Sequence, residues 1–160
     1  MLFSKKITSN QHGILYKIYK LDNKEQVPIK FFLTNTSPPF GVEDRYSKKI
    51  IKWVLEPFAS LDIRNFEAEL RVLFNKHIEN TNIEFISKIH KRDNFDDMLE
   101  TILEGESFDI IKHEEGEVIC FSNINHNFKC NVEIEVKSVN LSKDKIYYNL
   151  IVKKISNCVY

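Results

Sequence analysis

The stretch FKCNVEIEVKSV, from Phe128 to Val139, decides the fold class of this chain. Every second residue from Phe128 to Val136 is apolar, and the residues between them are charged or polar. This period of two is the pattern of a strand with one buried face and one solvated face. We therefore predict an antiparallel sheet that contains this strand, with the rest of the chain packed against it.

The predicted sheet has an N-terminal hairpin and a C-terminal four-strand meander. The hairpin strands are Ile14–Leu21 and Val27–Thr34, which flank a polar loop. The meander strands are Phe108–Lys112, Glu117–Ser122, Phe128–Val139 and Lys145–Ser156, each separated from the next by a turn-like segment. Residues 83–90 fit both a strand and a helix, and we favour a strand.

Three segments have helical periodicity. In the first, Tyr46, Ile50, Trp53 and Val54 recur at helical spacing, and Pro57 is expected to end the helix. The second is predicted to begin at Asp62, as its N-cap, and to carry an apolar stripe. The residues of that stripe are Phe66, Leu70, Leu73, Phe74, His77 and Ile78.

The third predicted helix is short and begins at an Asn94 cap. It carries Phe95, Met98, Leu99, Ile102 and Leu103, and Gly105 is expected to end it. Together these patterns predict an α+β fold, with a mainly antiparallel sheet and two or three helices packed on one of its faces. We expect residues 1–160 to form a single domain.

The composition narrows the class of protein. The 23 basic and 23 acidic residues balance, so no overall field draws the chain to nucleic acid or to a membrane, and we expect it to bind neither directly. The three cysteines have no repeated spacing, which favours free thiols in a reducing compartment. The first residues contain no apolar secretion signal, so we expect a cytoplasmic location.

The solvated face of the Phe128–Val139 strand carries an E-x-K sequence. Glu135 and Lys137 resemble the second half of the PD-(D/E)xK nuclease motif, in which a carboxylate holds a divalent cation and the lysine orients water. No Pro-Asp pair precedes them, and Asp109 is the available substitute. The alternative is a solvated strand face on which Glu133, Glu135 and Lys137 pair with lysines of the next strand, such as Lys145 or Lys153.

Four side chains of metal-ligand type follow one another as His113, Cys120, His126 and Cys130. A structural zinc site would need all four to converge. Both cysteines, however, lie in apolar strand segments, where a reduced cysteine is an ordinary core residue. The sequence contains no phosphate-binding glycine loop and no nucleophile elbow. We therefore expect no metal, no other cofactor and no enzymatic activity.

Negative charge is concentrated in residues 93–117, which contain ten acids and one base, Lys112. One interpretation is a solvated helix face. The other is a docking surface for a basic protein, since charge of one sign steers association. The acids predicted to bind the partner are Asp93, Asp96, Asp97, Glu100, Glu104, Glu106, Glu114, Glu115 and Glu117.

These observations lead to three functional hypotheses. The first is a small protein-binding module, concretely an immunity-type inhibitor that neutralises a basic bacterial toxin domain, such as a nuclease, through its acidic surface. The second is a divalent-metal-dependent nuclease that uses Glu135 and Lys137. The third is a small-molecule-binding α+β domain, whose sheet and helices would enclose an apolar pocket lined by some of the twelve Phe and six Tyr.

Overall fold

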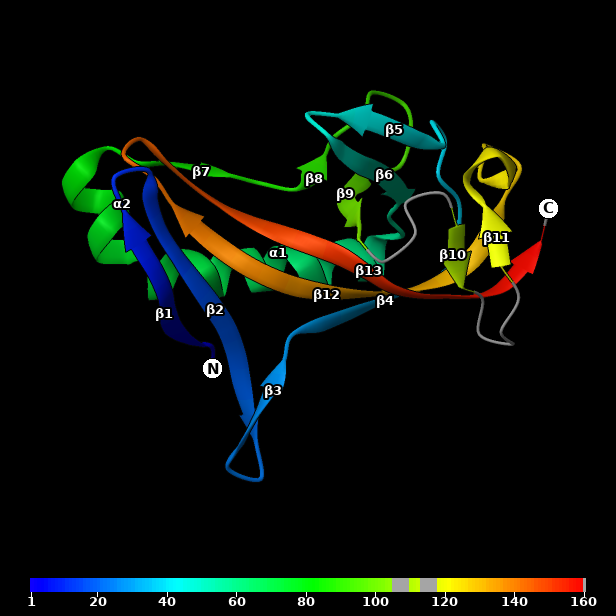
Figure 1. Cartoon of the computed structure of the whole chain (residues 1–160). Coiled ribbons are helices and arrows are strands. Elements are labelled where there is room, and N and C mark those ends of the chain that lie inside the picture. Colours follow the sequence, from blue (N-terminus) through cyan, green and yellow to red (C-terminus); the bar gives the residue numbers. More distant parts are fainter. Residues whose placement is uncertain (105–109, 113–117, 160) are drawn as a thin grey trace.

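The centre of the fold is a long hairpin of two strands, β12 (Lys129–Leu141) and β13 (Lys145–Val159). A computed structural model describes residues 1–104, 110–112 and 118–159. In β12, Cys130, Val132, Ile134 and Val136 are buried, and the residues between them are partly exposed, so the predicted two-faced strand is confirmed. Figure 1 shows the hairpin running the length of the molecule.

Eleven strands form one mostly antiparallel sheet, which gives a sheet-rich α+β fold with two α-helices in the described part of the chain. The main path through the sheet is β1-β2-β12-β13-β9-β6-β5, and β3, β4, β7 and β8 pair beside it. The other nine strands of this sheet are β1 (Phe3–Asn10), β2 (Gly13–Asp22), β3 (Glu25–Pro28), β4 (Lys30–Thr36), β5 (Val42–Arg45), β6 (Lys48–Val54), β7 (Glu84–Ile86), β8 (Ile89–His90) and β9 (Met98–Leu103).

The predicted N-terminal hairpin is present as β2 and β3, joined through Asn23 and Lys24. Its second predicted strand divides at Pro28, because β4 then pairs with β12 instead of β2. Strand β1, which has no clear period-two signal, pairs along the other side of β2. The β2–β3 hairpin consequently projects from the body of the sheet (Figure 1).

One face of the sheet is covered by α1 (Pro57–Leu73), which is followed by the short α2 (Asn75–Thr81). The apolar stripe of the second predicted helix is confirmed at Phe66, Leu70 and Phe74, which are buried. The predicted start is wrong, because α1 begins at Pro57 instead of Asp62. Proline is favoured in the first helical turn, where its missing N–H is not needed.

The first and third predicted helices are wrong, and strands occupy both places. Residues 43–56 form most of the β5–β6 hairpin, whose turn residues Tyr46 and Ser47 both have positive φ. The segment that follows Asn94 becomes β9, which pairs with β6 on one side and touches β13 on the other. In both segments the apolar residues fit a helical spacing and a strand alternation. Pairing with neighbouring strands therefore decides the structure, and local periodicity does not.

The C-terminal meander is only partly confirmed. β12 and β13 pair as predicted, whereas β10 (Ile110–Lys112) and β11 (Val118–Cys120) form a separate two-stranded sheet. The strand favoured within residues 83–90 is confirmed as β7 and β8, and β7 extends the main sheet by pairing in parallel with β13. Neither α1 nor any other helix of the described residues has the length and apolar character to cross a membrane.

Candidate functional site

The acidic residues of the predicted docking surface lie on a loop and on strand β9, so the predicted acidic helix face is wrong. Asp93 and Asp96 are exposed in the loop before β9, and Asp97 is half-buried. The Asp97 carboxylate forms an ion pair with Arg64 of α1, with 2.7 Å between Oδ2 and Nη2. Glu106, Glu114, Glu115 and Glu117 lie outside the described residues.

Glu100 is enclosed by three bases, which come from β5, from β8 and from the bend before β8. Its carboxylate oxygens lie 3.1 Å from Arg45, 3.3 Å from Lys88 and 3.3 Å from His90. The hydrogen bond with His90 and the positive charges of Lys88 and His90 outweigh burial, and they lower the pKa of Glu100 to about 2. Because its charge is already compensated within the chain, Glu100 is poorly suited to attract a partner.

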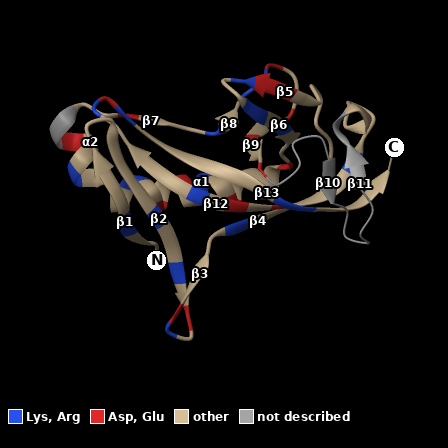
Figure 2. Ribbon diagram, in the orientation of Figure 1, with Lys and Arg blue, Asp and Glu red and all other residues tan. Residues whose placement is uncertain are grey.

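Glu104 likewise forms an ion pair within the chain, with Lys137 of β12. Figure 2 shows acidic and basic segments close together over β5, β6 and β9, so this part of the chain does not form a surface of one sign. Of the described acids in the predicted set, Asp93 and Asp96 are exposed and form no ion pair with another described residue, which suits contact with a partner.

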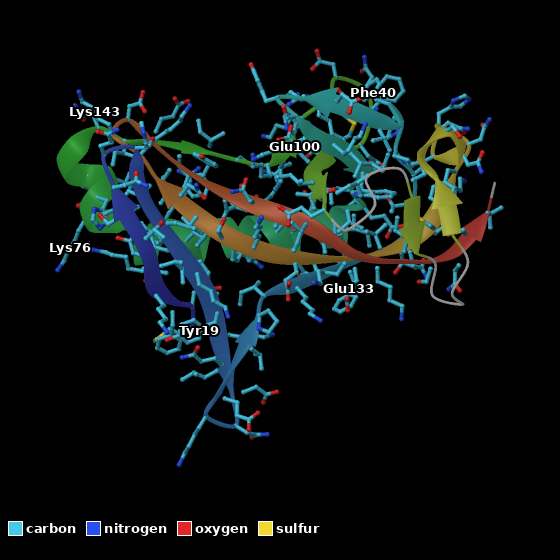
Figure 3. The ribbon with its side chains drawn as sticks, viewed as in Figure 1. Tyr19, Phe40, Lys76, Glu100, Glu133 and Lys143 are labelled. Carbon is cyan, nitrogen blue, oxygen red and sulfur yellow. The ribbon has the colours of Figure 1, made fainter. Side chains whose placement is uncertain are left out.

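The E-x-K face of β12 is a row of ion pairs to neighbouring strands. Glu133 lies 3.6 Å from Lys30 of β4, and Glu135 lies 3.8 Å from Lys153 of β13. Figure 3 shows Glu133 near β4 and Glu100 by the β6–β9 pair, so the two acids do not share a site. In the part of the chain that the structure describes, no three His, Cys, Asp or Glu residues could hold a metal ion together. Asp109 lies outside that part.

The candidate zinc ligands have different environments. Cys130 is fully buried on the apolar face of β12, and burial raises the pKa of its thiol far above the usual range. A thiol that stays protonated is a poor metal ligand and a poor nucleophile. His126 is exposed, whereas His113 and the side chain of Cys120 lie outside the described residues.

The aromatic residues between the sheet and the helices pack against one another. Phe66 of α1 meets Phe31 and Tyr148 edge to face, with ring centroids 5.3 and 5.4 Å apart. At the far end of the helix, Phe74 meets Tyr16 in the same manner at 5.0 Å. These rings fill the core between the two layers, where the third hypothesis expects a pocket.

An exposed apolar cleft of about 430 Å³ lies where the end of β6, the start of α1 and the loop before β9 meet. We call it the docking cleft, and its lining residues are Leu55, Pro57, Ser60, Leu61, Arg64, Phe95, Asp96 and Asp97. Two hydrogen bonds hold the loop before β9 in place: the Leu55 amide donates to the Asp97 carbonyl at 2.8 Å, and Arg92 Nε donates to the Asp96 carbonyl at 2.9 Å.

Large apolar side chains are exposed in and beside the docking cleft. Phe95 is 71% exposed and Leu61 is 54% exposed. Phe58, one helical turn before Leu61, is 84% exposed. Arg92 stacks over Phe95, with its guanidinium carbon 5.1 Å from the ring centroid. Exposed apolar groups with a polar rim are typical of protein interaction sites.

The sequence indicated only part of this surface. The acidic segment pointed to Asp93, Asp96 and Asp97, and the aromatic Phe95 lies between them in the chain. Phe58 and Leu61 could have been recognised from their position off the buried stripe of Phe66, Leu70 and Phe74. The proximity of Leu61 to Phe95, more than thirty residues later, depends on pairing of β9 with β6 and has no local signal.

Comparison with known proteins adds no family to this description: no protein-family model matches the sequence, and no curated protein matches it.

Proposed function

We propose that this chain is a small cytoplasmic protein-binding module, most concretely an immunity-type inhibitor that neutralises a bacterial toxin domain. The observation that carries the proposal is the docking cleft, where Leu61 and Phe95 are exposed beside Asp96 and Asp97. Phe58 is exposed one helical turn before Leu61. The partner is a protein with a basic surface, and its own apolar side chains occupy the cleft.

The two kinds of residue would contribute differently to binding. Exposed aromatic side chains at the centre of an interface supply most of the affinity when a partner buries them. Charged residues at the rim mainly accelerate association with a partner of opposite sign. Asp93 and Asp96 are therefore assigned to steering, and Phe58 and Phe95 are assigned to anchoring.

Asp97, Glu100 and Glu104 receive a different role from the one that the sequence suggested. Each forms an ion pair within the chain, with Arg64, Arg45 and Lys137 respectively. Releasing them to meet a partner would cost the interactions that they already make. We therefore restrict the proposed acidic contacts among the described residues to Asp93 and Asp96.

The test is capture of the partner from the native host with the immobilised chain, followed by binding kinetics with the purified partner. Phe58→Ala combined with Phe95→Ala should weaken the complex by about 30-fold or more, mainly through faster dissociation. Asp93→Asn combined with Asp96→Asn should slow association, and the difference should shrink at high salt.

The matched control is Phe40→Ala combined with Val72→Ala, which removes two exposed apolar side chains outside the docking cleft. This variant should bind as the wild type does. Equal binding by the wild type and by the Phe58/Phe95 variant would refute the proposal that the partner binds at the docking cleft. The toxin assignment needs one further result: the captured partner must arrest growth when expressed alone, and co-expression of this chain must restore growth.

A further inference from the structure

A second cleft, of about 380 Å³, lies on the main sheet. It is formed where β1, β2, β12, β13, β9 and the start of β6 approach one another, and we call it the sheet cleft. Its polar lining includes Lys17, Lys48, Lys137, Ser138, Asn140 and Asn149. The volume is within the range of small-molecule sites.

An irregularity in β12 helps to form this cleft. The register between β12 and β13 shifts between Val136 and Ser138, so Lys137 is an extra residue in its strand. In a regular strand, Lys137 and Ser138 would point to opposite faces. Here both line the sheet cleft. Such bulges often redirect a side chain beside a functional site.

Hydrogen bonds between side chains hold the polar floor of the sheet cleft in place. Asn149 Nδ2 donates to Ser138 Oγ at 3.3 Å and to Asn140 Oδ1 at 3.2 Å. Ser138 Oγ in turn donates to Asn140 Oδ1 at 3.3 Å. Because Asn140 Oδ1 accepts both bonds, its Nδ2 group stays available to donate to a ligand. The floor therefore presents a preorganised donor.

Among the described residues that line the sheet cleft, basic side chains outnumber acidic ones. Lys17, Lys48 and Lys137 come from three different strands, and Glu104 is the acid of this described lining. Glu104 forms its ion pair with Lys137. Within the described residues, Lys17 and Lys48 have no ion-pair partner, so two cations remain to attract an anion. Leu15 and Ile102 add apolar wall, which suits the carbon skeleton of an organic ligand.

We propose that the sheet cleft binds a small organic anion, whose carboxylate or phosphate group lies between Lys17, Lys48 and the Asn140 amide. Charge-assisted hydrogen bonds to an anion are stronger than neutral ones, and the apolar wall would bury the remainder of the ligand. This site is separate from the docking cleft and does not depend on the proposed function.

The test is an NMR titration of the full chain with three probes of similar shape: phenyl phosphate, benzoate and neutral benzyl alcohol. Either anion should produce saturable shifts of the Asn140 and Asn149 side-chain amides, with a Kd of about 1 mM or tighter. Benzyl alcohol should not. A response to phenyl phosphate alone would assign the anion to the phosphate class, and a response to benzoate alone would assign it to the carboxylate class.

Charge-matched variants separate this site from unspecific attraction. Lys17→Gln combined with Lys48→Gln should weaken binding at least about tenfold. Lys24→Gln combined with Lys76→Gln removes two exposed lysines elsewhere and should leave binding unchanged. All four lysines are exposed, so each variant should fold. The proposal fails if neither anion gives saturable shifts, or if both double variants weaken binding equally.

Discussion

The hydroxyl of Tyr148 donates a hydrogen bond to the carboxylate of Glu67 at 2.8 Å, and both residues are buried between β13 and α1. The same hydroxyl oxygen accepts the Lys88 amide at 3.4 Å. A carboxylate at this depth is costly unless it is paired. The contact therefore joins the helix to the central hairpin by a polar interaction inside an apolar layer.

We expect Tyr148→Phe to destabilise the protein by about 1–3 kcal/mol, because the buried Glu67 carboxylate loses its donor. The double variant Tyr148→Phe/Glu67→Met should recover part of the lost free energy of unfolding, because neither polar group is then buried without its partner. Urea unfolding of the two single variants and the double variant measures the coupling. The control is Tyr147→Phe, on the opposite face of β13, with an expected change within about 0.5 kcal/mol.

The same pair predicts a loss of stability in alkali. Burial, followed by the negative charge of Glu67, raises the pKa of Tyr148 far above its usual value. The folded protein therefore keeps a proton that the unfolded chain releases near pH 10. The contribution of Tyr148 should be complete below that pH and should decrease above it. Unfolding of wild type and Tyr148→Phe between pH 8 and 11 should give a stability difference that shrinks as the pH rises.

In the parts of the fold that the sequence predicts correctly, the spacing of apolar residues fits one type of secondary structure and excludes the other. In β12, five alternations in succession fit a strand and exclude a helix. In α1 and at its C-cap, the spacing of Phe66, Leu70 and Phe74 fits a helix and excludes a strand. Both patterns come from a single buried face, and the structure buries that face in each case.

In the parts that the sequence predicts wrongly, the spacing of apolar residues fits both a helix and a strand. Residues Ile51, Trp53 and Leu55 alternate into the core, yet Tyr46, Ile50 and Trp53 also have helical spacing. The turn at Tyr46–Ser47 contains no glycine and therefore lacks the usual signal of a two-residue hairpin turn. In β9 the buried Thr101 interrupts the apolar alternation, and its hydrogen-bond partner lies 48 residues away.

The candidate sites are harder to predict from the sequence than the fold is. Composition located the acids, but it could not show that Glu100 meets Arg45 and that Asp97 meets Arg64. These pairings arise from contacts between strands and helices that are distant in the chain. The sheet cleft depends on the bulge at Lys137, which interrupts the β12–β13 register and has no sequence signal of its own.

Thr101 is expected to contribute to stability through Trp53, the single tryptophan. The indole Nε1 donates to Thr101 Oγ1 at 3.0 Å, and that hydroxyl donates to the Ile51 carbonyl at 2.9 Å. Thr101→Val keeps the shape but leaves the buried indole N–H unpaired, so we expect a loss of about 1–3 kcal/mol. Tryptophan fluorescence in urea measures it. Thr34→Val, at an exposed strand position, is the control and should change stability by less than about 0.5 kcal/mol.

Glu100 is expected to make stability depend on pH in the acid range. Its pKa falls from 4.5 to about 2, chiefly through the hydrogen bond with His90. Because the folded pKa is lowered, the stabilisation should be complete above about pH 4.5 and should disappear as the pH falls to about 2. Glu100→Gln should cost about 1–3 kcal/mol at pH 7, after allowance for solvent screening, and almost nothing near pH 2.

The control for this pH dependence is Glu104→Gln, which removes an exposed ion pair with Lys137. It should change stability by less than about 1 kcal/mol at every pH. Urea unfolding of both variants at pH 7, 4 and 2.5 makes the comparison. A Glu100→Gln penalty that is the same at pH 7 and pH 2.5 would show that the charge of Glu100 does not contribute.

The β5–β6 turn should become more stable with glycine. Ser47 has a φ of 64°, in the left-handed region, and its neighbour Tyr46 has a φ of 51°. Left-handed backbone costs a residue with a Cβ about 1 kcal/mol, and a two-residue turn of this kind favours glycine at its second position. We expect Ser47→Gly to raise the free energy of unfolding by about 0.5–1 kcal/mol.

The same substitution in a strand should have the opposite effect. Ser4 is exposed in β1, where glycine only increases the conformational freedom of the unfolded chain, so Ser4→Gly should lower stability by about 0.5–1 kcal/mol. Thermal and urea unfolding of the two variants, side by side, compare one chemical change in two backbone conformations. If both variants lose stability, the left-handed conformation at Ser47 is not a source of strain, and the hairpin turn is held by contacts of the serine side chain instead.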